Sequence, residues 1–98
     1  MMSPLVHRKI EYLGDIITDL KILDEELEAT NDVGLRYQLE EEKEEVLKLF
    51  DEAANDCLII LEAYMDDCKE HGIPVYLDYK RVLRELKNAK RLGIIEEV

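Results

Sequence analysis

The run from Val46 to Cys68, VLKLFDEAANDCLIILEAYMDDC, constrains the fold more than any other stretch of this sequence. At 100° per residue on a helix, its apolar side chains fall on one broad face, and the acids in and beside it gather on the opposite side. The acids assigned to this acidic face are Glu45, Glu52, Asp56 and Asp67. The run predicts a long helix with one face in a hydrophobic core and an acidic face in solvent.

Two isoleucines in this run do not fit that division. Ile59 and Ile60 place apolar side chains beside the acidic face. A helix that is apolar beyond one core face usually buries the remainder against a second partner. We therefore expect a partner or dimer interface that includes Ile59, Ile60, Ile16 and Tyr64.

The first helix is expected over residues 4–30. Ser3 is a typical N-cap residue, and Pro4 suits the first helical position. Apolar residues then recur at spacings of three and four, the pattern of a helix that packs along another helix. Gly14 lies inside this pattern, and we interpret it as the point of a close helix crossing. Residues 31–34 (NDVG) supply the turn that follows.

The second and third helices are expected over residues 35–71 and 79–92. Gly72 can adopt the left-handed conformation that ends a helix, and the proline two residues later prevents its continuation. Asp78 is the expected N-cap of the third helix, and Gly93 is the expected end of that helix.

Together these segments predict an all-α fold in one domain spanning residues 1–98. Two long helices form a hairpin, a shorter C-terminal helix folds back on it, and a second copy completes a dimeric four-helix-type bundle. The charged segment 40–45 (EEEKEE) leaves three alternatives open. It projects from the domain, a partner chain covers it, or the second helix breaks there.

The charge balance narrows the classes of partner. The net charge of −11 argues against direct binding to nucleic acid or to an anionic membrane, because phosphate contacts need Lys and Arg. It permits a partner with a basic surface. Residues 1–71 hold 20 acids and 7 bases, whereas residues 72–98 hold 4 acids and 6 bases. These two parts could attract each other within one molecule or between two.

The chain shows no apolar run long enough to span a membrane and no signal-peptide pattern, so we expect a soluble, cytoplasmic protein. Cys57 and Cys68 lie eleven residues apart on one expected helix, about 16 Å along its axis, which is too far for a disulfide. We expect both to be buried, reduced thiols. No metal-binding or phosphate-binding motif is present, so neither a metal nor a cofactor is expected.

Two groups of charged residues admit both a functional and a structural interpretation. Glu52 and Asp56, four apart on one helix face, could bind a divalent cation if a twofold mate supplied more ligands, although a solvated acidic face is the simpler interpretation. A row of bases follows the outer side of the third helix, at Lys80, Arg84, Lys87 and Arg91. This basic strip could contact phosphates, but pairing with the acidic second helix is favoured by the net charge.

The order of these features resembles the HepT-like branch of the HEPN superfamily. The first helix begins LVHRKIEYLGDIITDLKIL, and the second carries an E-x-x-x-D, here Glu52 and Asp56. The third matches the pattern Y-x-x-x-h-x-x-L … G-I-I at Tyr79, at Leu83 or Leu86, and at residues 93–95. The resemblance implies an all-helical, dimeric protein.

Many proteins of that branch look like toxin ribonucleases paired with a nucleotidyltransferase-type antitoxin. Their signature is an Arg followed four to six residues later by a His, on a helix after the G-I-I segment. Here the histidines are His7 and His71, and neither stands in that pattern. The resemblance therefore carries over the scaffold and the Glu52/Asp56 pair without a catalytic residue.

The leading functional hypothesis is a non-catalytic helical interaction module, HEPN-like, in a toxin–antitoxin or defence-type complex. Its partners would be a second copy and a nucleotidyltransferase-type antitoxin or a protein with a basic surface. An alternative is a small acidic decoy that mimics nucleic acid toward a basic nucleic-acid-binding protein. A second alternative is a metal-dependent enzyme that uses Glu52 and Asp56 in a dimer.

Overall fold

A computed structural model describes residues 2–96, which form three helices and no strand. They are α1 (Pro4–Ala29), α2 (Val33–His71) and α3 (Leu77–Arg91). The predicted all-α fold is confirmed, as are the long hairpin and the shorter helix folded back on it. Residues 1, 97 and 98 of the expected domain lie outside the described residues.

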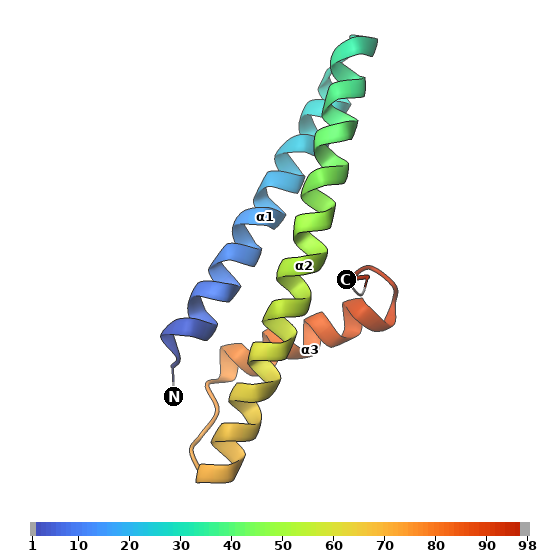
Figure 1. Cartoon of the computed structure of the whole chain (residues 1–98). Helices are drawn as coiled ribbons and strands as arrows, with labels where there is room; N and C mark the ends of the chain where they lie inside the picture. The colour runs from blue at the N-terminus through green and yellow to red at the C-terminus, as the bar shows by residue number, and fades with distance from the viewer. Residues whose placement is uncertain (1, 97–98) are drawn as a thin grey trace.

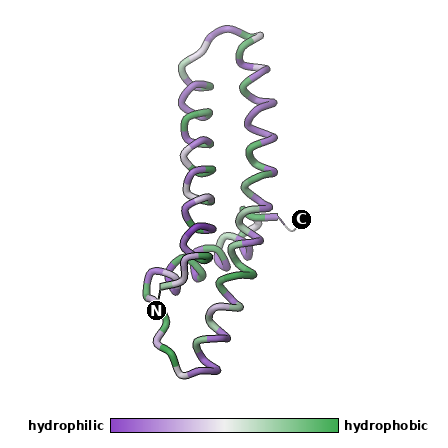
Figure 2. The backbone as a smooth tube through the Cα atoms, turned by 60° about the vertical axis from the view of Figure 1, so that its left-hand side comes forward, coloured by the Kyte–Doolittle hydropathy of each residue, from purple (hydrophilic) through white to green (hydrophobic). Residues whose placement is uncertain are grey.

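The hairpin gives the molecule an elongated shape, with extents of 57 × 22 × 16 Å. The two long helices lie antiparallel and side by side, and α3 crosses α2 in the half that is distant from the α1–α2 connection (Figure 1). The backbones of α1 and α3 do not pack against each other, because each helix packs on α2. Hydrophobic and hydrophilic segments alternate along both hairpin legs, as expected for helices with one buried face (Figure 2).

The helix starts follow from side-chain caps. Ser3 Oγ accepts a hydrogen bond from the Val6 amide at 3.4 Å, as its predicted N-cap role requires. Asp32 Oδ1 accepts from the amides of Gly34 and Leu35 at 2.9 and 3.2 Å. Because Asp32 caps α2, the helix starts at Val33, two residues before the predicted start.

The start of α3 differs from the prediction in its capping residue. The N-cap position is occupied by Tyr76, whose side chain makes no capping hydrogen bond. Asp78 lies inside the first turn, where its negative charge favours the helix N-terminus, and it pairs with Arg81 at 3.0 Å. The expected Asp78 cap is therefore wrong.

Both predicted glycine terminations are confirmed. Gly72 and Gly93 have φ of 65° and 77°, the left-handed region that suits glycine. At each site the amide of the residue that follows the glycine donates to a carbonyl of the last helical turn: Ile73 to Cys68 and Ile94 to Ala89, both at 2.9 Å. These bonds satisfy carbonyls that a helix end leaves open.

The main core lies where α3 crosses the hairpin. Its centre is α2, whose Ala54, Cys57 and Leu61 are fully buried. Both thiols are free and buried, as predicted. A smaller cluster near the connection joins Leu23 and Leu27 of α1 to Leu39 of α2.

This smaller cluster decides how the charged segment 40–45 is arranged. α2 continues through it without a break, with Leu39 buried against α1 just before it. Lys43 also forms an ion pair with Asp24 of α1. The segment therefore packs against α1 on one side. It neither projects from the domain nor breaks the helix, and coverage of its other side by a partner chain stays a prediction.

Gly14 does not mark a close helix crossing. A Cβ atom built on it would meet nothing within 4 Å. The interpretation of this glycine as a crossing point is wrong, because the side of α1 that carries Gly14 has open space beside it.

Tyr79 joins the N-terminus of α1 to α3. Its hydroxyl accepts a hydrogen bond from the Ser3 amide at 3.1 Å and donates one to the Ser3 carbonyl at 3.0 Å. Its ring packs edge-on against Tyr64 and Tyr76, with centroids 5.2 and 4.9 Å apart. No helix among the described residues has the length and apolar content needed to cross a membrane.

Candidate interaction surfaces

The four residues expected at a partner interface are placed differently. Ile16 and Tyr64 are only 5% and 8% exposed and lie in the core of this chain, so a partner could not reach them without opening that core. This corrects their assignment to a partner surface. Ile60 is partly buried against the same core. Ile59 is 67% exposed and remains open to a partner.

Ile59 lies in a groove between α2 and α3, which we call the basic groove. Its volume is about 430 Å³, and its lining combines apolar and polar side chains of α2 with three bases of α3: Asn55, Leu58, Ile59, Glu62, Lys87, Lys90 and Arg91. The spacings of three, four and seven on α2, and of three and four on α3, put these residues on facing sides of two crossing helices.

The predicted basic strip meets the acidic helix at one position only. Lys87 lies 3.8 Å from Glu62 of α2. Arg91 instead bonds to Asn88 of its own helix at 2.7 Å. Lys80 and Arg84 are exposed, and neither is in an ion pair among the described residues. The position along α3 explains this result, because Lys87 and Arg91 line the basic groove with α2, whereas Lys80 and Arg84 are not part of its lining.

A second, apolar groove lies on the other side of α3, between α3 and α1. Its volume is about 310 Å³, and its lining is almost entirely apolar: Ile10, Leu13, Gly14, Ile17, Phe50, Val82, Glu85, Leu86, Ala89 and Ile95. The groove exists because α1 and α3 both pack on α2 without packing on each other. Gly14 adds to it by leaving space where a side chain would stand.

Sequence reasoning missed the residues that hold the C-terminal segment. Asn55 Nδ2 donates to the Glu96 carbonyl at 2.7 Å, and the Glu96 amide donates to Asp51 Oδ1 at 3.3 Å. Ile95, the residue before Glu96, is 3% exposed. The signal available in the sequence was an asparagine inside a segment of strong helix formers. Asparagine is unfavourable in a helix interior unless its side-chain amide forms a hydrogen bond there.

The predicted acidic face is exposed along its whole length. Glu45, Glu52, Asp56 and Asp67 are all solvent-exposed, and Asp67 pairs with His71. Among the described residues, Glu52 and Asp56 have no third ligand close enough to complete a cation site. The geometry of one chain therefore leaves this pair as two exposed carboxylates.

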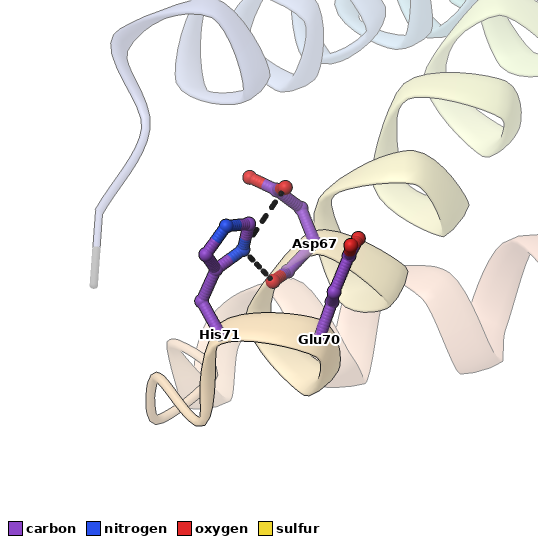
Figure 3. A group of neighbouring side chains, drawn as sticks. All are labelled: Asp67, Glu70 and His71. Atoms are coloured by element: carbon purple, nitrogen blue, oxygen red, sulfur yellow. Dashed lines mark hydrogen bonds and ion pairs between the residues drawn. The ribbon is translucent and has the colours of Figure 1, made fainter.

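Three side chains at the end of α2 do come close together, and the sequence analysis did not identify them. Potential ligand atoms of Asp67, Glu70 and His71 lie within 4.8 Å of one another. The imidazole Nδ1 lies 2.9 Å from the Asp67 carbonyl oxygen and 3.4 Å from its carboxylate, as the dashed lines show (Figure 3). All three are exposed, so the arrangement fits a solvated group of polar side chains at the helix C-terminus.

Comparison of the chain with protein-family models, with curated proteins and with solved structures finds no match. The resemblance to HEPN-type proteins therefore stays an expectation from the sequence patterns given above.

Proposed function

We propose that this chain is a non-catalytic helical interaction module. The observation that carries the proposal is the two-thirds exposure of Ile59, on the central core helix, inside a groove with a charged rim. An apolar centre with a polar rim is the usual anatomy of a protein–protein interface. Within the described residues no side chain of Asp, Glu, His, Lys or Arg is buried, and the two buried thiols lie inside the hydrophobic core rather than in a groove.

The energetic argument favours association at this position. Complete burial of an isoleucine contributes about 1.5–3 kcal/mol, and two thirds of the Ile59 surface is still available. Covering it would therefore contribute about 1–2 kcal/mol, which changes a dissociation constant about five- to thirtyfold.

The setting that we propose is a toxin–antitoxin or defence-type complex. Its support is the sequence resemblance, together with the long hairpin and the Glu52/Asp56 spacing on α2. In this setting the partner is a nucleotidyltransferase-type antitoxin. Co-expression with the protein encoded by the adjacent reading frame tests this part directly: co-purification at 1:1 would support it, and separate elution would contradict it.

Light scattering coupled to size exclusion tests the module itself. We expect a mass of about 23 kDa, twice the 11.5 kDa of one chain, for the protein alone, or a 1:1 complex with the adjacent partner. Ile59→Ser should weaken that association about tenfold. Leu5→Ser is the matched control, because Leu5 is 50% exposed on α1, outside the basic groove. A chain that stays monomeric at about 100 µM and ignores the adjacent partner would refute the proposal.

The decoy alternative is favoured by a separate observation. Exposed carboxylates follow α2 from Glu45 to Asp67, 22 residues or about 33 Å. If they imitate a phosphate backbone, the chain should bind a lysine-rich DNA-binding protein and be displaced by short duplex DNA. If duplex DNA does not displace the chain from that protein, nucleic-acid mimicry is contradicted.

The enzymatic alternative depends on a second copy to complete a site around Glu52 and Asp56. Both carboxylates are exposed. If a divalent-ion-dependent activity is found, replacing both by alanine should abolish it, and activity that persists would place the site elsewhere.

A further inference from the structure

Charge is separated along the length of this molecule. Residues 19–45, which include the α1–α2 connection and which we call the acidic end, hold eleven acids and three bases, a net charge of −8. The helix α3 holds two acids and six bases, a net charge of +4. The acidic end and α3 lie in opposite halves of a molecule 57 Å long, so they cannot neutralise each other within one chain (Figure 1).

The basic groove and the acidic end share one side of α2. Tyr37 and Ile59 are 22 residues apart, which is six helical turns plus 40°, so both lie on nearly the same stripe. Glu41, Glu44 and Asn55 lie within 40° of Tyr37 on that stripe. Tyr37 and Ile59 are each 67% exposed. The stripe therefore presents an aromatic side chain among carboxylates at one end and an open basic groove at the other, about 33 Å away.

From this arrangement we infer that the basic groove receives the acidic end of a second copy of this chain, in an antiparallel twofold dimer. Tyr37 of one protomer lies against Ile59 of its partner, and Glu41 and Glu44 lie beside the partner's Lys87 and the partner's Arg91. Twofold symmetry makes this contact twice, once at each end of the pair. The inference rests on the proposed function, since it names the partner and the arrangement for the same groove.

Charge complementarity selects this arrangement over the parallel one. A parallel pair places two ends of −8 side by side, whereas the antiparallel pair places each −8 end beside a +4 helix. Each chain has a net charge of −11, so two chains repel each other. At physiological salt this repulsion is largely screened between charges more than about 8 Å apart. The local contacts between carboxylates and bases are screened less.

The centre of such a pair is also suited to contact. On α2, between the acidic end and the basic groove, a hollow is lined in part by Leu47 and Ile94, which are 41% and 62% exposed. The C-terminal segment that carries Ile94 is fixed by Asn55 and Asp51, so this apolar side chain is held in place before association.

Charge reversal with rescue tests the arrangement. One variant carries Lys87→Glu and Arg91→Glu, and the other carries Glu41→Lys and Glu44→Lys. Each variant alone sets like charges against each other at both contacts, so its dimer should dissociate at least about tenfold more readily than the wild type. In a 1:1 mixture both contacts again pair opposite charges, and a heterodimer of near wild-type affinity should form. All of these residues are exposed, so circular dichroism should show unchanged helix content.

Cysteine pairing provides a second measurement that does not depend on affinity. Mixed Tyr37→Cys and Ile59→Cys variants should form a covalent heterodimer on mild oxidation, since the native thiols are buried. A Tyr12→Cys variant mixed with Ile59→Cys is the control, because Tyr12 is exposed on α1 away from the stripe. A dimer that shows neither rescue nor cross-linking would overturn the antiparallel arrangement and leave the proposed function standing. A monomer would overturn both unless the adjacent partner binds.

Discussion

Removing one hydroxyl, with Tyr79→Phe, tests how α3 is attached to the start of the hairpin. The side chain is 1% exposed, and its hydroxyl makes two hydrogen bonds to the backbone of Ser3, 76 residues away. Phenylalanine keeps the ring, so the edge-on contacts with Tyr64 and Tyr76 remain. The substitution therefore isolates the hydrogen bonds from the packing.

The expected loss follows from the two bond lengths, 3.1 and 3.0 Å, which are ordinary for hydrogen bonds. Each such bond contributes about 0.5–1.5 kcal/mol net to folding. Ser3 is half-buried, so water can replace part of what its amide and carbonyl lose. We expect the free energy of unfolding to fall by about 1–2 kcal/mol. For a domain of this size each 1 kcal/mol lowers Tm by about 4–8 °C.

Urea denaturation followed by circular dichroism measures this change, with the slope of the transition checked for two-state behaviour. Tyr12→Phe is the control, since Tyr12 is 51% exposed and its substitution should change the free energy of unfolding by less than about 0.5 kcal/mol. If Tyr79→Phe is as neutral as the control, the hydroxyl does not tie α1 to α3 and the account of this junction is refuted.

Three further predictions concern backbone freedom and a buried thiol. Gly14→Ala should raise the free energy of unfolding by about 1 kcal/mol in urea titrations, because the helix gains propensity and the new methyl group meets nothing. Gly93→Ala should lower it by about 1 kcal/mol or more in the same assay, because φ at that position is +77°. Burial raises the pKa of the Cys57 thiol from 9.0 to about 11. The unfolded chain therefore releases this proton first as pH rises from 9 to 11. Stability should fall over that range by up to about 1.4 kcal/mol per pH unit, and a Cys57→Ala variant should show a shallower fall in the same titration.

The helices themselves could be predicted from local signals. A proline after Ser3, and glycines at positions 72 and 93, act within one turn of the chain and do not depend on the rest of the fold. The start of α3 was misassigned because aspartate is favoured both as an N-cap and inside the first turn. The backbone enters the helix at Tyr76, and only the three-dimensional path of the 72–76 connection fixes that position.

The surfaces were less predictable, since periodicity gives the apolar face of a helix without naming what covers it. Ile16, Tyr64 and Ile59 are all predicted from the sequence to face a partner. In the structure the core covers the first two, and Ile59 lies just past the edge of the crossing. The crossing position of α3, set by packing around Tyr79 and Leu83, decides which of them stays exposed. For the same reason the sequence could not show that only Lys87 of the basic strip would face Glu62.

The unequal lengths of the helices explain why a surface is left for association. α2 has 39 residues and is about 58 Å long, whereas α3 has 15 residues and crosses it at one place. α1 follows α2 on one side, so among the described residues the stripe from Tyr37 to Lys48 is covered only where residues 94–96 lie beside it. Carboxylates keep this uncovered stretch in solution, and their charge also limits which surfaces can approach it. The basic groove on the same stripe has the opposite charge. The fold therefore supplies both an acidic surface and a basic surface that can pair with it in a second copy.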